Sequence, residues 1–457
     1  MKDILIYNTL TRKKEKFEPV NKGEVRMYVC GITPYGKTHL GHARCYVVFD
    51  VFKRFFECLG YNVRYIQNVT DIDDKIINKS RKTKKPPLEI AEKYFKDFLE
   101  VMEVLNVLPA DEYPKVSHTI KDIIRFVQGL IEKNMAYHVD GNVYFRVSKI
   151  SEYGKLSRRD PEELLSSQEM KSEQKSDPRD FALWKKDEEF GWSSPWGKGR
   201  PGWHIECSAM AKKYLGERFD IHGGGRDLVF PHHENEIVQS KSLTGKDPAK
   251  YWLHNGMVKM KGDKMAKSTG NFFILRDLLK EFNPMVVRMY LLMSNYRQDI
   301  DFDLDSLKDT NKAYNKMLEF KKEVSELDKG YSKEIGVDER DSVLEALSND
   351  LNTAGAIGEI FKKTTPILER IFKNKVKEDD ILKGKKLINY FEQILGIKLE
   401  IRTEKKVEEI EELVNKREKL RKNKKYKQAD KIRNQLNNLG IEVKDTPSGP
   451  KWFQKKS

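Results

Sequence analysis

Metal-binding side chains are concentrated in the stretch from His222 to Glu236. It opens with three glycines, which allow backbone to approach a ligand closely, and ends in Pro231-His232-His233-Glu234-Asn235-Glu236. Proline is favoured in the first turn of a helix, and a helix from Pro231 would place His232 and Glu236 on one face, close enough to share a cation. The stretch therefore predicts a metal site; the alternative is a loop followed by a solvated helix face.

Two of the four cysteines can complete such a site. Cys30 closes an apolar, strand-like run, and Cys207 lies in the sequence Trp-His-Ile-Glu-Cys-Ser. Two thiolates, one imidazole and one carboxylate form a credible zinc shell. His233-Glu234 also suggests a zinc-protease helix, but no second His follows at the required spacing, which argues against that class.

The elements that must position these residues begin with a β-loop-α-β pattern. Residues 25–29 read as a buried strand, 45–59 as an apolar helix ending before Gly60, and 62–69 as a second strand. Such a unit predicts an α/β, doubly wound, Rossmann-like parallel sheet whose ligand lies beyond the carboxyl ends of the strands. Cys30 and the 31–44 loop fall at that edge.

The 31–44 loop also fits a nucleotide-hydrolase pattern. Residues 31–38 match the Walker A motif, and Tyr46-Val47-Val48-Phe49-Asp50 mimics a Walker B strand. A crossover back to the sheet needs a dozen residues or more, so a second strand cannot end at Asp50, and we expect Asp50 to be helical. We favour His39-Leu40-Gly41-His42, where two imidazoles at a helix N-terminus flank a glycine that admits an adenine or a phosphate.

These motifs carry a family resemblance. Thr33-Pro34-Tyr35 and 39–44 resemble the first signature of class I aminoacyl-tRNA synthetases, and Lys264-Met265-Ala266-Lys267-Ser268 resembles their second. With 68–75, 201–208 and 222–236, the pattern is similar to the cysteinyl-tRNA synthetase family over nearly the whole chain, most weakly in 110–200 and 310–400. The departures are Leu40, Ala266 and Ala354, where the family usually has Ile, Ser and Pro. None of them removes a charged group.

The resemblance implies ATP-dependent activation of L-cysteine to cysteinyl-adenylate and its transfer to the 3′ end of tRNA(Cys). It implies one Zn²⁺ per chain on Cys30, Cys207, His232 and Glu236, which selects cysteine through its thiolate. ATP is a substrate, with Mg²⁺. The resemblance implies a catalytic role for His39, His42, Lys264 and Lys267. It implies that ATP is bound by Gly41, His42, Lys264 and Lys267. It implies that the amino-acid substrate is bound by Thr70, Trp203 and Asp227, with Asp227 facing the α-ammonium. For Trp203, core packing is the alternative.

The chemistry of activation agrees with these residue types. A carboxylate attacks the α-phosphorus of ATP, so the site must position two anions and stabilise charge that builds on the phosphates. Histidine and lysine donors suit that task without a covalent nucleophile. Lys264 and Lys267 lie beside Gly262 and Gly270, in a loop that we expect to close over the triphosphate.

We expect six regions along the chain. They are the first half of the catalytic nucleotide-binding domain (1–109), an inserted domain with helix-like and mixed patterns (110–200), the second half of the catalytic domain (201–260), a connecting domain with the second signature (261–310), a helical bundle (311–400) and a small basic domain (401–457). Residues 402–457 hold 17 basic and 9 acidic residues. The last region resembles the family's anticodon-binding domain, with Trp452 a candidate to stack on an unpaired base.

Composition is compatible with these expectations. The chain has 457 residues, a net charge of +15 and a pI near 9.2. Such a positive charge is compatible with a polyanionic partner, but a lysine-rich proteome would give the same charge without one. Four cysteines without close spacing suit a reducing cytosol. We expect no signal peptide, no membrane segment, a cytoplasmic protein and a monomer. Two rivals are the cysteine ligase of mycothiol synthesis and a catalytically idle RNA-binding paralogue.

Overall fold

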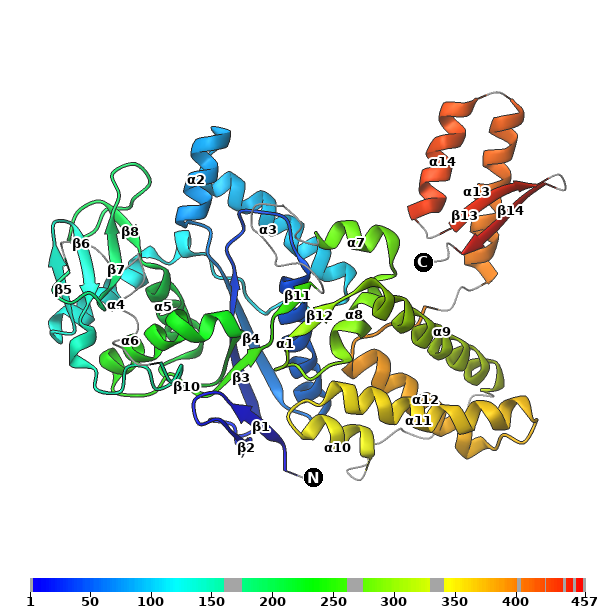
Figure 1. Cartoon of the computed structure of the whole chain (residues 1–457), viewed down its shortest axis with the longest axis horizontal. Coiled ribbons are helices and arrows are strands. Elements are labelled where there is room, and N and C mark those ends of the chain that lie inside the picture. The colour runs from blue at the N-terminus through cyan, green and yellow to red at the C-terminus, as the bar shows by residue number, and fades with distance from the viewer. Residues whose placement is uncertain are drawn as a thin grey trace.

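The computed structural model describes residues 3–159, 175–260, 274–328, 341–400, 404–423, 425–438, 441–446 and 449–454. Its centre is a four-stranded parallel sheet in the order β10-β9-β3-β4 (Figure 1). The strands are β3 (Glu24–Ile32), β4 (Asn62–Val69), β9 (Phe219–Gly225) and β10 (Ala249–Asn255). Because β3 and β4 come from the first half of the chain and β9 and β10 from the second, the order reverses between β3 and β9, where doubly wound sheets bind ligands.

Helices cover both faces of this sheet, as the sequence predicts. Helix α1 (Leu40–Cys58) connects β3 to β4, and α5 (Trp203–Leu215) and α6 (Glu234–Thr244) belong to the other side. Side chains alternate along β3: Val25, Met27 and Val29 pack with α1, whereas Tyr28 and Cys30 pack in the core that contains α5. The alternation directs the Cys30 thiol toward α5 and α6.

Helix α1 contains Asp50, and its helical conformation excludes a Walker B strand. The Asp50 carboxylate is buried, accepts a hydrogen bond from Arg54 Nε at 2.8 Å and is paired with Arg288. It also accepts from the Leu108 N–H at 2.8 Å. A carboxylate used in this way is committed to joining α1 to its neighbours and is unavailable to hold a nucleotide's magnesium.

The segment between β4 and α5 contains helices and a second sheet. Its helices are α2 (Asp74–Thr83), α3 (Pro87–Val104) and α4 (Ile120–Glu132). An antiparallel meander follows, of β5 (Ala136–Val139), β6 (Asn142–Phe145), β7 (Phe181–Lys186) and β8 (Gly199–Pro201). The sequence does not indicate this meander, because strands of three to six residues are too short to establish a period.

The remaining elements extend the α1 side of the molecule (Figure 1). A hairpin of β1 (Leu5–Asn8) and β2 (Lys13–Lys16) opens the chain, and β11 (Val258–Met260) pairs in parallel with β12 (Ile300–Phe302). The helices are α7 (Leu275–Glu281), α8 (Pro284–Leu292), α9 (Leu304–Leu327), α10 (Ser342–Ser348), α11 (Thr353–Phe372) and α12 (Glu378–Asn389). The helix-rich character expected after residue 284 is thus observed.

The C-terminal segment forms two helices and a hairpin. Helices α13 (Glu404–Lys422) and α14 (Tyr426–Asn438) are followed by β13 (Ile441–Thr446) and β14 (Gly449–Gln454). Val414, Ile432, Leu436 and Ile441 form their own small core. The amphipathic helix was expected from the sequence, but the hairpin was not. None of the helices in the described part of the chain combines the length and apolarity needed to span a bilayer.

Candidate active site and metal centre

Four metal-competent side chains meet on the α5/α6 side of the sheet. Cys30 comes from β3, Cys207 from α5, and His232 and Glu236 from the 229–244 region, and their ligand atoms lie within 4.8 Å of one another. The two sulfur atoms are 3.8 Å apart, and His232 Nε2 lies 3.1 Å from Glu236 Oε1. Helical spacing sets the second contact, as expected, although α6 itself begins only at Glu234. The structure thus brings together all four residues proposed as zinc ligands.

This cluster has the dimensions and chemistry that zinc requires. Two sulfur atoms on a tetrahedral zinc, each about 2.3 Å from the ion, are about 3.8 Å apart, which matches the observed separation. Glu236 Oε2 is buried without a hydrogen-bond partner in the described structure. Burial raises the pKa of the Cys30 and Cys207 thiols, so a nearby cation is needed to ionise them.

A second, overlapping set also has the spacing of a metal site: Cys30, His222, His233 and Glu236. We favour the first set because Cys30, Cys207 and His232 line a cavity, whereas His222 and His233 are buried away from it. A substrate thiolate must reach the metal as a further ligand, and three of the four side chains of the first set border the cavity from which it would come, against one of the second set.

Histidines that were not predicted from the sequence support this site. His204 Nδ1 lies 3.0 Å from His232 Nδ1. The His233 ring lies between two partners: its Nε2 is 3.3 Å from Cys30 Sγ, and its Nδ1 is 2.8 Å from His254 Nε2. The other ring nitrogen of His254, Nδ1, lies 2.8 Å from Thr9 Oγ1. Partners of this kind orient metal-binding imidazoles and thiols. Only the clustering of His232 and His233 was visible in sequence, because His204 and His254 come from separate elements.

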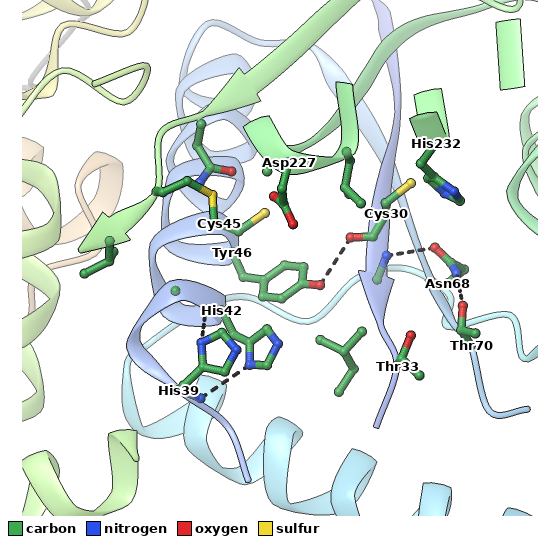
Figure 2. Close-up of a pocket in the computed structure, with 18 of the residues that line it drawn as sticks. Cys30, Thr33, His39, His42, Cys45, Tyr46, Asn68, Thr70, Asp227 and His232 are labelled. Atoms are coloured by element: carbon green, nitrogen blue, oxygen red, sulfur yellow. Dashed lines mark hydrogen bonds between the residues drawn. The ribbon is translucent and has the colours of Figure 1, made fainter. Parts of the chain in front are cut away.

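The cavity beside the cluster has a volume of about 370 Å³. It is lined by the residues expected to bind cysteine and ATP that lie in the described chain, namely His39, Gly41, His42, Thr70, Trp203 and Asp227. Figure 2 shows His39, His42, Thr70 and Asp227 around it. Trp203 is 40% exposed, and its ring stacks on His232 with centroids 4.5 Å apart. It is therefore a wall of the cavity rather than a core residue.

A hydrogen-bond chain fixes the β3–β4 edge of the cavity. The Gly31 N–H donates to Asn68 Oδ1 at 2.8 Å, and Asn68 Nδ2 donates to Thr70 Oγ1 at 3.3 Å (Figure 2). Thr70 in turn donates to buried Glu206 at 3.1 Å. A Cβ on Gly31 would lie 1.5 Å from the Asn68 carbonyl oxygen, so no side chain fits there. The chain holds the Thr70 hydroxyl in one orientation, and Glu206 is a supporting residue that sequence reasoning missed.

His39 and His42 form the start of α1. Each ring Nδ1 accepts from the other residue's backbone N–H, at 3.4 and 3.3 Å, and the two rings stack (Figure 2). Burial lowers the pKa of both imidazoles, most strongly for His42. Since Nδ1 accepts in a neutral ring, Nε2 carries the proton and can donate to a phosphate oxygen.

The other sequence candidates divide into three groups. Lys264, Ala266 and Lys267 lie outside the described residues. Lys37 of the Walker A pattern is exposed and does not line the cavity. The glycine triplet belongs to strand β9 rather than a loop, and a Cβ on Gly223 would lie 2.3 Å from the Phe49 ring, so this glycine serves packing against α1.

Comparison with known proteins adds the family context. The family described as "tRNA synthetases class I (C) catalytic domain" matches residues 16–312, and the family "Cysteinyl-tRNA ligase anticodon binding domain" matches residues 405–452. The chain is 45% identical to a protein named cysteine–tRNA ligase of Thermococcus gammatolerans, over 98% of both chains. It is 43% identical to the protein of that name from Lactobacillus gasseri, over 98% of this chain and 99% of that one.

Solved structures support the fold alone, since sequence identity is low. Mycobacterium tuberculosis methionyl-tRNA synthetase in complex with methionyl-adenylate aligns with a TM-score of 0.57 and 16% identity, over 81% of this chain and 89% of that chain. A putative arginyl-tRNA synthetase from Campylobacter jejuni aligns with a TM-score of 0.53 and 16% identity, over 83% and 94%.

Proposed function

Because this chain belongs to the cysteine–tRNA ligase family of class I tRNA synthetases, we infer that it activates L-cysteine with ATP and transfers the cysteinyl group to tRNA(Cys). The observation that carries the inference is one cavity bordered at one end by Cys30, Cys207 and His232 and at the other by His39 and His42. The first end suits a thiol-bearing amino acid, and the second suits the phosphates of ATP.

We propose one Zn²⁺ per chain, held by Cys30, Cys207, His232 and Glu236. The bound ion would supply a Lewis acid that favours sulfur and could accept the substrate thiolate as an additional, fifth ligand, which the hydroxyl of serine and the methyl group of alanine match poorly. The S–S separation of 3.8 Å and the buried Glu236 Oε2, which has no hydrogen-bond partner in the described structure and lies 3.5 Å from His222 Nε2, support this assignment.

The remaining lining residues position the two substrates. We propose that Asp227 accepts the α-ammonium group of cysteine, while Thr70 and Trp203 shape the pocket around it. The Nε2–H of His42, with His39 and Gly41, would bind the phosphates, and Lys264, Lys267 and Mg²⁺ would neutralise the charge that develops as pyrophosphate leaves. In this arrangement the protein aligns a carboxylate with the α-phosphorus and needs no covalent nucleophile.

The C-terminal match argues against the rival enzyme class. A ligase that joins cysteine to an aminosugar has no use for an anticodon-binding domain, whereas residues 405–452 match one. An idle RNA-binding paralogue has no need for the paired imidazoles and the thiol cluster in one cavity. Cysteine-dependent exchange between ATP and pyrophosphate tests the proposed function. We expect exchange with cysteine and less than about 1% of that rate with serine or alanine; no exchange with cysteine would refute it.

We expect deletion of residues 402–457 to spare adenylate formation and to cripple tRNA charging. The cavity lies wholly outside this segment, whose 17 basic and 9 acidic residues favour contact with a polyanion. Trp452, on β14, is our candidate for stacking on an anticodon base. The measurement compares pyrophosphate exchange with charging of tRNA(Cys) in the truncated and full-length proteins. Equal charging efficiency would show that the segment does not read tRNA.

We also propose that the enzyme is cytoplasmic and monomeric. All four cysteines are free thiols, which suits a reducing compartment. Light scattering of the purified protein tests the monomer, for which a mass near 53.5 kDa is expected.

A further inference from the structure

A second cavity, of about 410 Å³, shares Asp227 with the first as a lining residue. Its walls come from the β1–β2 turn, residues 156–159, residues 226–230 and Arg297. Backbone N–H groups of Leu156 and Ser157 donate to Glu234 at 3.4 and 2.8 Å, which fixes the second wall to α6. Because Asp227 lines both cavities, a ligand in the second one would lie beside the residue that we assign to the α-ammonium of cysteine.

This second cavity is strongly basic. Four arginines line it (Arg12, Arg159, Arg226 and Arg297), against the single carboxylate of Asp227. Arg226 and Arg297 have carboxylate partners outside the lining, Asp299 at 3.1 Å and Asp350 at 2.9 Å. Within the described residues, Arg12 donates only to the Ser157 carbonyl at 3.3 Å, and the Arg159 side chain has no carboxylate partner. Two guanidinium groups are therefore available to an anion.

Two arginines of this cavity lie against aromatic rings. Arg159 lies over the ring of Phe230 with 5.1 Å between guanidinium and centroid, and Arg297 lies over Tyr7 at 4.2 Å. Flat surfaces of this kind stack with unpaired bases, and guanidinium groups pair with phosphates in a bidentate manner. Arginine and aromatic groups together favour single-stranded nucleic acid over a simple inorganic anion.

We propose that this arginine cavity binds the single-stranded 3′ end of tRNA during transfer, a proposal that rests on the function inferred above. In that step a hydroxyl oxygen of the terminal ribose bonds to the cysteinyl carbonyl carbon, the bond from that carbon to the AMP phosphate oxygen breaks, and the hydroxyl proton leaves with AMP. The first cavity contains the residues that we assign to cysteine and ATP, and we expect the ribose to enter from a neighbouring opening. The arginine cavity supplies one that borders Asp227.

The double variant Arg12→Ala/Arg159→Ala tests this proposal. We expect pyrophosphate exchange to stay within about twofold of wild type, because exchange needs no tRNA. Single-turnover transfer from preformed cysteinyl-adenylate to tRNA(Cys), at subsaturating enzyme, should slow by roughly tenfold for each arginine, the worth of a charged hydrogen bond. Two lost phosphate contacts should also make the slope of log affinity against log salt shallower by about 1.4.

A shortened tRNA locates the contact. The double variant should bind full-length tRNA(Cys) more weakly than wild type does, and the difference should vanish with tRNA lacking its last three nucleotides. Arg64→Ala is the matched control. It removes an arginine from an exposed pair with Glu112, near the amino end of β4 and so at the opposite edge of the parallel sheet, and it should leave both steps unchanged.

Several outcomes would overturn the proposal. Normal transfer by the double variant would do so, as would an equal loss of affinity for full-length and shortened tRNA. If the double variant loses exchange through misfolding, the single variant Arg159→Ala is tested in the same way, because the Arg159 side chain is exposed and its loss should not disturb folding. Failure of the wild-type protein to exchange pyrophosphate would instead refute the proposed function, so the two failures are distinguishable.

Discussion

Replacement of Cys207 by Ser will remove zinc and raise the cysteine concentration needed for activation by at least about a hundredfold, while ATP affinity stays near that of the wild type. Serine is close to cysteine in size, so the packing of this buried position changes little. A hydroxyl does not ionise at neutral pH and is a hard ligand, so it cannot replace a thiolate that lies 3.8 Å from Cys30. Losing one of four protein ligands, together with the energy of the metal–thiolate bond, accounts for the size of the effect.

Elemental analysis and cysteine-dependent pyrophosphate exchange measure this effect in the same preparation. Cys58→Ser is the matched control, because Cys58 lies at the end of α1 and outside both candidate ligand sets. We expect the Cys58→Ser protein to retain zinc. Cys45 should be similarly dispensable for metal binding, although it borders the cavity. Metal retention by Cys207→Ser, or metal loss by Cys58→Ser, would contradict the ligand assignment.

His42→Ala will slow cysteine activation by roughly a hundredfold, about the worth of one lost donor to the developing charge. The ring lines the cavity, and its Nδ1 is occupied by the His39 N–H, which leaves Nε2–H for a phosphate. Lys37→Ala should cost much less, because Lys37 is exposed and outside the cavity lining. A P-loop enzyme would show the opposite order, with Lys37 essential for nucleotide turnover.

Pyrophosphate exchange by the two single variants distinguishes these mechanisms. Since His42 also helps to cap α1, His42→Asn is the appropriate companion: asparagine keeps a side-chain acceptor near the His39 N–H but has no imidazole. We expect both His42 variants to be slow and to melt near the wild-type temperature. An inactive Lys37→Ala enzyme beside a fully active His42→Ala enzyme would refute our assignment.

Local pattern was sufficient to predict the framework of the site. The apolar runs at residues 25–29 and 62–69 are long and uniform, so their strands were identifiable. Asp50 is helical, as expected from the length that a crossover connection requires. The four proposed ligands were also identifiable, because thiol and imidazole groups are few and the spacing of His232 and Glu236 is helical. The doubly wound fold follows from these elements and is confirmed.

Features that depend on contacts between distant segments were not predictable. His254 and His204 contact His233 and His232 only because β10 and α5 pack beside β9 and α6. No spacing in the sequence predicts this packing. Gly31 resembles any loop glycine, yet it is required by its approach to Asn68. The existence of two overlapping ligand sets likewise follows from the packing of four elements.

Zinc content and cysteine-dependent exchange of the wild-type protein together test the central claim most directly. We expect about one zinc per chain, and removal of the metal with a chelator should abolish exchange with cysteine while the cavity still binds ATP. Exchange should return in proportion to the zinc restored. Wild-type protein that is metal-free as purified and fully active in cysteine-dependent exchange would contradict this account.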